Sequence, residues 1–79
     1  MTLDKAFKLR LEHYLKDRNI TIHKFVKDGA IARSTITNLL QGNSKSPTLT
    51  TLYQVANALD ITVLEFLDCD LFRDENIDF

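Results

Sequence analysis

Several residue types are scarce in this 79-residue chain, which has one cysteine, one proline, two glycines and no tryptophan. A single thiol, Cys69, forms no disulfide within the chain and makes no zinc site, so we expect a reduced, cytoplasmic setting. No apolar run approaches the roughly 20 residues of a membrane span, and the first ten residues lack the apolar segment of a signal peptide. We therefore expect no membrane partner.

Residues that usually carry catalysis or bind metals are equally sparse. His13 and His23 have no Asp, Glu or Cys around them at catalytic or metal-ligand spacing. The neighbours of Cys69 in the sequence are acidic, whereas cationic surroundings activate a thiol. The chain also lacks a glycine-rich phosphate loop. We therefore expect no enzyme activity, no catalytic or metal site, no cofactor and no small-molecule substrate.

The charge of the chain is small overall but unevenly distributed. The formal net charge is −1. Residues 1–58 contain nine Lys and Arg against four Asp and Glu, a net charge of +5, whereas residues 59–79 contain one basic and seven acidic residues, a net charge of −6. A basic part followed by an acidic tail fits a protein that faces a polyanion with one side. An ordinary soluble domain with an acidic tail has the same pattern.

Apolar residues recur at helical spacing in five segments of the chain. This pattern predicts an all-α fold, a compact five-helix bundle with no sheet. The expected helices cover roughly residues 3–18, 22–28, 33–41, 49–59 and 63–67. We divide the chain into one domain, residues 1–67, and a short acidic C-terminal tail, residues 68–79. In the fourth helix we assign one apolar stripe to the core, formed by Leu49, Leu52, Val55, Ala56 and Leu59.

Several residues mark the ends of these helices. Thr21 and Thr48 are good N-caps, and the sequence from Thr62 to Glu65 is a capping box. Asn19 and Gly42 are typical residues at the C-terminal end of a helix, where a left-handed conformation is common. The segment 21–41 therefore reads as two short helices joined by a tight turn, which is the helix-turn-helix plan.

The second helix of this unit has two different sides. On a helical wheel its apolar residues Ile36, Leu39 and Leu40 fall together. Another arc, centred more than a third of a turn away, carries only side chains that can hydrogen-bond: Arg33, Ser34, Thr37, Asn38 and Gln41. Such a face suits the major groove of DNA, where polar side chains reach the base edges. Any surface helix also has a polar face, so the pattern by itself leaves both interpretations open.

From about residue 7 to residue 67 the chain resembles the phage repressor/Cro-type, or Xre-like, helix-turn-helix family. The residues that carry this resemblance are Thr21, Phe25-Val26, Arg33-Ser34-Thr35-Ile36, Gly42, Pro47-Thr48-Leu49, Leu52, Val55-Ala56, Ala58-Leu59 and Ile61-Thr62. The resemblance implies a lambda-repressor-like five-helix domain. It further implies a protein that binds a double-stranded DNA operator, usually as a homodimer, and regulates transcription.

The family's functional positions can be carried over residue by residue. Base readout falls on Arg33, Ser34, Thr37 and Asn38. The phosphate-contacting positions fall on Ile22, Gln41, Asn43, Ser44 and Lys45, to which we add Thr21 and Thr35. We expect the Arg33 guanidinium to bind a guanine edge and Lys45 to contact only phosphate.

The chain departs from the family pattern in four respects. Ile22 stands where a phosphate-binding Gln is common, which weakens one anchor. Ala30 replaces the usual turn glycine, with Gly29 one place earlier, and Ala32 is a poor N-cap for the third helix.

The fourth departure is a pair of positions. Leu15 and Leu40 stand where many members carry an Arg and a Glu that form an ion pair. Because replacing both partners with apolar residues strands no charge, we expect an intact fold in which these two leucines touch.

The end of the chain is rich in apolar residues. We expect a dimer interface at Phe66, Leu67, Leu71 and Phe72, with Val63, Leu64, Ile77 and Phe79 as further candidates; alternatively, the tail folds back on its own domain. The sequence thus predicts a sequence-specific DNA-binding regulator that acts as a dimeric repressor. A protein-interaction module on the same fold, antirepressor-like or toxin-neutralising, is the alternative, and the acidic tail and Ile22 favour it.

Overall fold

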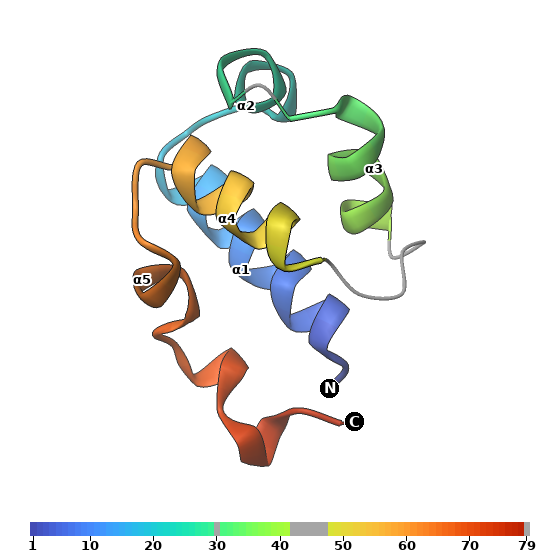
Figure 1. Cartoon of the computed structure of the whole chain (residues 1–79), viewed down its shortest axis with the longest axis vertical. Helices are drawn as coiled ribbons and strands as arrows, with labels where there is room; N and C mark the ends of the chain where they lie inside the picture. Colours follow the sequence, from blue (N-terminus) through green and yellow to red (C-terminus); the bar gives the residue numbers. More distant parts are fainter. Residues whose placement is uncertain (30, 42–47, 79) are drawn as a thin grey trace.

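The computed structural model describes residues 1–29, 31–41 and 48–78, with Leu39 described by its backbone only. Five α-helices follow one another, and two 3₁₀ turns complete the chain (Figure 1). The elements are α1 (Leu3–Asp17), α2 (Ile22–Gly29), α3 (Arg33–Gln41), α4 (Leu49–Ala58), α5 (Val63–Leu67), η1 (Asp70–Phe72) and η2 (Asp74–Asn76). The expected all-α, five-helix fold is therefore confirmed. Within the described ranges the only extended pairing is an isolated bridge between Thr2 and Asp78.

Threonine side chains begin three of the helices, as their positions in the sequence predict. The Thr21 hydroxyl accepts the backbone N–H of Lys24 at 3.2 Å, and the Thr48 hydroxyl accepts that of Thr51 at 3.1 Å. Thr62 and Glu65 form a complete capping box at the start of α5. Each cap satisfies an N–H group that has no partner within its own helix, which typically stabilises by about 1 kcal/mol.

Two helices end in the same motif. Asn19 and Asp60 both adopt positive φ values, 55° and 58°, directly after the C-cap residues of α1 and α4, Arg18 and Leu59. The following residues donate their N–H groups backwards, Ile20 to the carbonyl of Leu15 and Ile61 to that of Ala56, both at 2.9–3.0 Å. These are Schellman closures, in which the apolar residue after the turn packs on the core. They reverse the chain after α1 and after α4.

The core lies between α1 and the helices around it. Phe7, Leu11 and Leu15 of α1 are buried at spacings of four, with Ile36 of α3 and Val55 of α4 completely buried beside them. One residue of the expected α4 stripe does not belong to this core. Leu49 is 70% exposed, because it lies in the first turn of α4, at the edge of the bundle.

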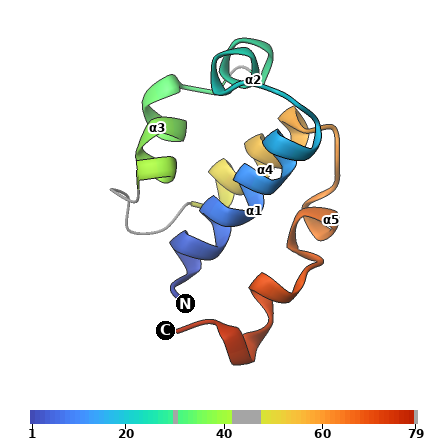
Figure 2. The same cartoon turned by 180° about the vertical axis from the view of Figure 1, so that it is seen from behind.

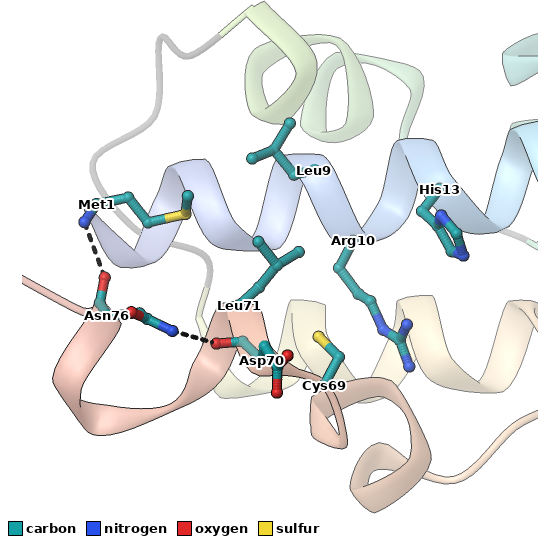
Figure 3. A pocket seen from close by; sticks show the side chains of 8 residues that line it. All are labelled: Met1, Leu9, Arg10, His13, Cys69, Asp70, Leu71 and Asn76. Atoms are coloured by element: carbon teal, nitrogen blue, oxygen red, sulfur yellow. Dashed lines mark hydrogen bonds between the residues drawn. The ribbon is translucent and has the colours of Figure 1, made fainter.

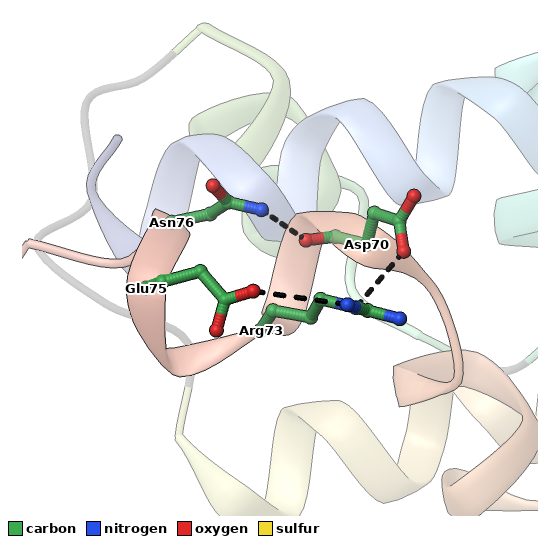
Figure 4. Close-up of polar contacts among 4 residues, drawn as sticks. All are labelled: Asp70, Arg73, Glu75 and Asn76. Atoms are coloured by element: carbon green, nitrogen blue, oxygen red, sulfur yellow. Dashed lines mark hydrogen bonds and ion pairs between the residues drawn. The ribbon is translucent and has the colours of Figure 1, made fainter.

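The acidic tail folds back on its own domain, which was one of the two arrangements expected from sequence. Ile77 is only 8% exposed, and the Met1 ammonium pairs with the Asp78 carboxylate at 3.1 Å and donates to the Asn76 carbonyl at 2.8 Å. Both termini therefore lie together (Figures 1 and 2). Within the tail, Arg73 pairs with Asp70 and Glu75, while the Asn76 amide donates to the Asp70 carbonyl (Figure 4). These contacts hold the two 3₁₀ turns in one compact loop.

Helices α2 and α4 approach each other closely at Gly29. A Cβ atom placed on Gly29 would lie 2.7 Å from the Cβ of Ala58, nearer than real Cβ contacts come. The space beside Ala58 thus admits only a residue without a side chain at position 29. Ala30, which replaces the family's usual turn glycine, lies outside the described residues.

Leu15 and Leu40, which stand in place of the family's ion pair, occupy the same region. Leu15 is buried and Leu40 packs on the core that contains it. Both also line one shallow hollow between α1, α2 and α3. Neither side chain points away into solvent, in line with the expected contact, whose distance of about 4.5 Å stays a prediction.

We expect Gly29→Ala to destabilise the domain by about 1–3 kcal/mol, because the added methyl group overpacks the α2–α4 contact. In an exposed helix a Gly→Ala substitution stabilises by up to about 1 kcal/mol. The sign of the change in unfolding free energy therefore tells whether Gly29 is closely packed. Ala58→Gly should restore part of the loss when the two changes are combined. Urea denaturation of the three variants measures this, and an unchanged or raised stability of Gly29→Ala would contradict the close approach.

We expect Leu40→Glu to lower stability by about 2 kcal/mol or more, because it places a carboxylate against an apolar side chain without a dedicated partner. Leu40→Met is the matched control and should cost less than about 1.5 kcal/mol. Adding Leu15→Arg to Leu40→Glu should recover part of the loss by forming an ion pair. A melting temperature that Leu40→Glu leaves unchanged would show that this position does not contribute to the core.

Candidate nucleic-acid interface

Helix α3 presents its polar side to solvent and its apolar side to the core. Ile36 is completely buried and Leu40 packs on the core. Arg33, Ser34 and Asn38 are exposed. Thr37 is half-buried and Gln41 is exposed, so the polar residues expected to read bases or contact phosphate lie along one accessible face. The anchored apolar side fixes which face points outwards.

The start of α2 lies beside Arg33 and shares a hollow with Leu40. At one end of α3, the Arg33 guanidinium is hydrogen-bonded to the Nδ1 atom of His23 at 3.4 Å. At the other end, Thr21 and Ile22 line the same hollow as Leu40, from the last turn of α3. The candidates for base readout and for phosphate contact on these two helices therefore form one continuous surface.

The expected phosphate-contacting residues fall into three groups. Thr21 and Ile22 are exposed at the start of α2, where the Thr21 hydroxyl already caps the helix. Ile22 is 40% exposed, and its side chain has no donor for a phosphate. Thr35 is half-buried on α3 and Gln41 is exposed at its end. Asn43, Ser44 and Lys45 lie outside the described residues, as does Gly42, the expected stop of this helix.

The electrostatic setting of this surface suits a polyanion. Neither α2 nor α3 has an acidic residue in its first turn, so the positive ends of both helix dipoles are not neutralised there. Lys24, Lys27 and Arg33 are exposed on these helices. The acidic tail packs against the start of α1, away from α3 in both views (Figures 1 and 2). The uneven charge of the sequence is thus also a separation in space.

Two other arginines have structural tasks. Arg10 donates through Nε to the Phe66 carbonyl at 2.8 Å and through Nη2 to the Glu65 carbonyl at 2.9 Å. Arg18 donates to the Leu59 carbonyl at the end of α4. Both guanidinium groups also lie over the ring of Tyr14, at 4.6 and 5.3 Å from its centre. These cations complement helix C-termini, so we do not assign them to the interface.

His23 is a candidate residue that the sequence does not point to. In the sequence it is only a histidine without catalytic or metal-ligand neighbours. It lies ten residues before Arg33 in the chain. No periodicity in the sequence joins these two positions, because only the turn between α2 and α3 brings them together.

The expected dimer interface needs one correction. Phe66 is completely buried, with ring centroids 5.1 Å from Phe7, 6.1 Å from Tyr14 and 6.0 Å from Phe72. It is a core residue of its own domain and has no surface to offer a partner. Leu67 and Phe72 also pack on this core. The physical reason is the folded-back tail, which supplies the apolar cover that a second copy was expected to provide.

Leu71, the fourth expected interface residue, lines a separate hollow of about 470 Å³ between α1 and the tail (Figure 3). Leu9, Arg10 and His13 face it from α1, while Cys69 and Asp70 face it from the tail. No residue of α3 or of the start of α2 lines this hollow.

Two short helices joined by a turn, with the second buried on one side and polar on the other, define a helix-turn-helix protein. The model of the Cro/C1-type HTH DNA-binding domain matches residues 10–71. The chain therefore belongs to this family, and the resemblance seen in the sequence is confirmed. No curated protein sequence matches the chain.

Solved structures support the same fold. The crystal structure of the prophage Lp1 protein 11 is similar at 27% sequence identity and a TM-score of 0.80, over 94% of this chain and 99% of that chain. The complex of the SinR and SinI proteins is similar at 21% identity and a TM-score of 0.68, over 91% of this chain and 67% of that chain. Family membership makes the chain a DNA-binding regulator. In the described parts of the chain, no helix has both the length and the apolar character to cross a bilayer.

Proposed function

We propose that this protein binds double-stranded DNA in a sequence-specific manner and regulates transcription as a dimeric repressor, with α3 in the major groove. The observation that carries the proposal is the accessible polar face of α3, which Ile36 anchors to the core and which continues onto the start of α2. A helix seated in the major groove reads bases with its own side chains, while flanking groups contact phosphates.

The residues on this surface have different tasks in the proposal. Arg33 opens α3 and carries the five N–H donors that suit the O6 and N7 atoms of guanine. Asn38 is exposed on the same face and suits adenine, while Ser34 and Thr37 are shorter and reach either kind of base. Thr21, Ile22, Thr35 and Gln41 flank this face and contact the backbone, with Ile22 limited to its main-chain N–H.

The first experiment is retention of the purified protein on bulk DNA or heparin, measured against salt concentration. A protein that neutralises several phosphates loses affinity steeply as salt rises. Selection of bound genomic fragments then supplies the operator sequence. A protein that neither column retains at low salt would contradict DNA binding. It would favour the alternative function, a protein-interaction module on this fold.

We expect Arg33→Ala to weaken binding to the selected operator by about 1–3 kcal/mol and to relax the preference at one base pair in each half-site. The matched control is Arg73→Ala, which removes an exposed arginine paired with Asp70 and Glu75 in the tail. This control should leave both affinity and preference unchanged. Titrations on operator and scrambled DNA at two salt concentrations measure both effects.

Equal weakening of operator and scrambled DNA by Arg33→Ala would identify Arg33 as a phosphate contact. In that case the assignment of the reading face to the start of α3 would be wrong. An effect of Arg73→Ala as large as that of Arg33→Ala would mean that general charge alone explains the loss.

The dimer in this proposal keeps Leu64 and Leu67 from the surface expected from sequence and adds two exposed residues of α4. Leu49 and Tyr53 on α4 are 70% and 60% exposed, and Leu64 on α5 is 79% exposed. Leu67 lines one hollow with Leu49 and another with Leu64, so these three leucines belong to neighbouring parts of one surface. A helix-turn-helix dimer reads two half-sites about 34 Å apart on a two-fold operator.

We expect Leu64→Arg to convert the dimer into a monomer, because it places a charge on this apolar surface. Leu64→Met, the control, conserves volume and apolar character and should keep the dimer. Since the side chain is 79% exposed in the single chain, neither change should unfold the monomer itself, which circular dichroism checks. Light scattering at micromolar concentration decides the result; a wild-type protein that is already monomeric, on DNA as well as free, would refute the dimer.

A further inference from the structure

We propose that His23 is a positioning residue for Arg33, and that it sharpens the preference of Arg33 for one base pair. This inference rests on the proposed DNA-reading function. His23 is the second residue of α2 and Arg33 is the first residue of α3. Their side chains meet across the turn between the two helices, with Nη1 of Arg33 3.4 Å from Nδ1 of His23. Both side chains are exposed on the surface assigned to DNA.

The chemistry of the two groups settles the direction of this hydrogen bond. A guanidinium carries only donors, so the Nδ1 atom of His23 must accept. In the tautomer that makes this contact, the imidazole proton sits on Nε2. A protonated ring has no lone pair at Nδ1 and would repel Arg33. The contact therefore selects one tautomer of His23 in the free protein.

This hydrogen bond is compatible with base readout. The guanidinium has five N–H donors, and a bidentate contact with guanine uses two of them. Nη1 itself carries two, so one can stay on His23 while the other faces the base. His23 can thus hold the side chain at the start of α3 without competing with the DNA.

Holding the arginine in advance has a consequence for selectivity. A long, exposed side chain loses rotamer freedom when it docks on a base, and this loss opposes binding. A contact that already restricts the side chain in the free protein reduces the loss on binding. This smaller loss of rotamer freedom favours binding where Arg33 makes its bidentate contact, which is at its preferred base pair. Removal of His23 should therefore reduce discrimination at that base pair more than it reduces general affinity.

The alternative role for His23 is a contact of its own with a phosphate. It is exposed in the first turn of α2, close to the candidate phosphate positions Thr21 and Ile22. A phosphate contact by His23 would strengthen binding to every sequence equally, with or without Arg33. The two roles therefore differ in their dependence on Arg33 and on the sequence of the DNA.

A double-mutant cycle separates them. His23→Ala removes the acceptor, and His23→Asn replaces Nδ1 by an amide oxygen at a similar reach. Each is combined with Arg33→Ala and titrated on the selected operator and on the same operator changed at the base pair that Arg33 reads. We expect His23→Ala to reduce discrimination at this base pair by about two- to tenfold, the range of one hydrogen bond. His23→Asn should retain most of the discrimination, and in the Arg33→Ala background His23→Ala should have no further effect.

A second readout needs no DNA. The ¹⁵N shifts of the His23 ring should show an unprotonated Nδ1 in the wild type and a more mixed tautomer in Arg33→Ala. Operator binding with an unaltered preference in His23→Ala would overturn the inference while leaving the proposed function intact. The inference would also be overturned if His23→Ala weakened binding equally to the operator and to its changed version, and did so in the Arg33→Ala background as well. A chain that binds no DNA would overturn the proposed function, and this inference with it.

Discussion

Side chains on one face of α1, from Phe7 through Leu11 to Leu15, form the surface against which the rest of the domain packs. Ile36 fixes α3 to this core, and Phe66 fixes α5 to it through ring contacts with Phe7 and Tyr14. The polar groups of α1 extend the same role, because Arg10 and Arg18 donate to carbonyls at the ends of α5 and α4. One helix thus organises the core on one side and complements two helix dipoles on another.

This arrangement separates the candidate interface from the rest of the charged surface. Burial of Ile36 leaves the polar residues of α3 outside, and the close approach at Gly29 sets the position of α2 against α4. The start of α2 then lies beside Arg33. The acidic residues of the tail are held at the start of α1 by Met1 and Ile77. A polyanion approaching α3 therefore meets the basic part of the chain first.

Prediction from sequence succeeded where a local rule decides the structure. The threonine caps, the left-handed residue after α1 and the helical spacings each depend on only a few neighbouring residues. It failed for Leu49, which has the right spacing for a core stripe but lies in the first turn of α4 and is exposed. It also failed for Phe66, because an apolar residue near the end of a chain is equally suited to a core and to an interface.

The sequence by itself determined the five helices, their caps and the polar face of α3, since these follow from patterns within single segments. The family resemblance added the positions Arg33, Ser34, Thr37 and Asn38 as a reading face. Only the tertiary structure decided that the tail covers Phe66, that Leu64 and Tyr53 remain exposed, and that His23 meets Arg33. Each of these depends on which surfaces of different segments come together, and no spacing within one segment contains that information.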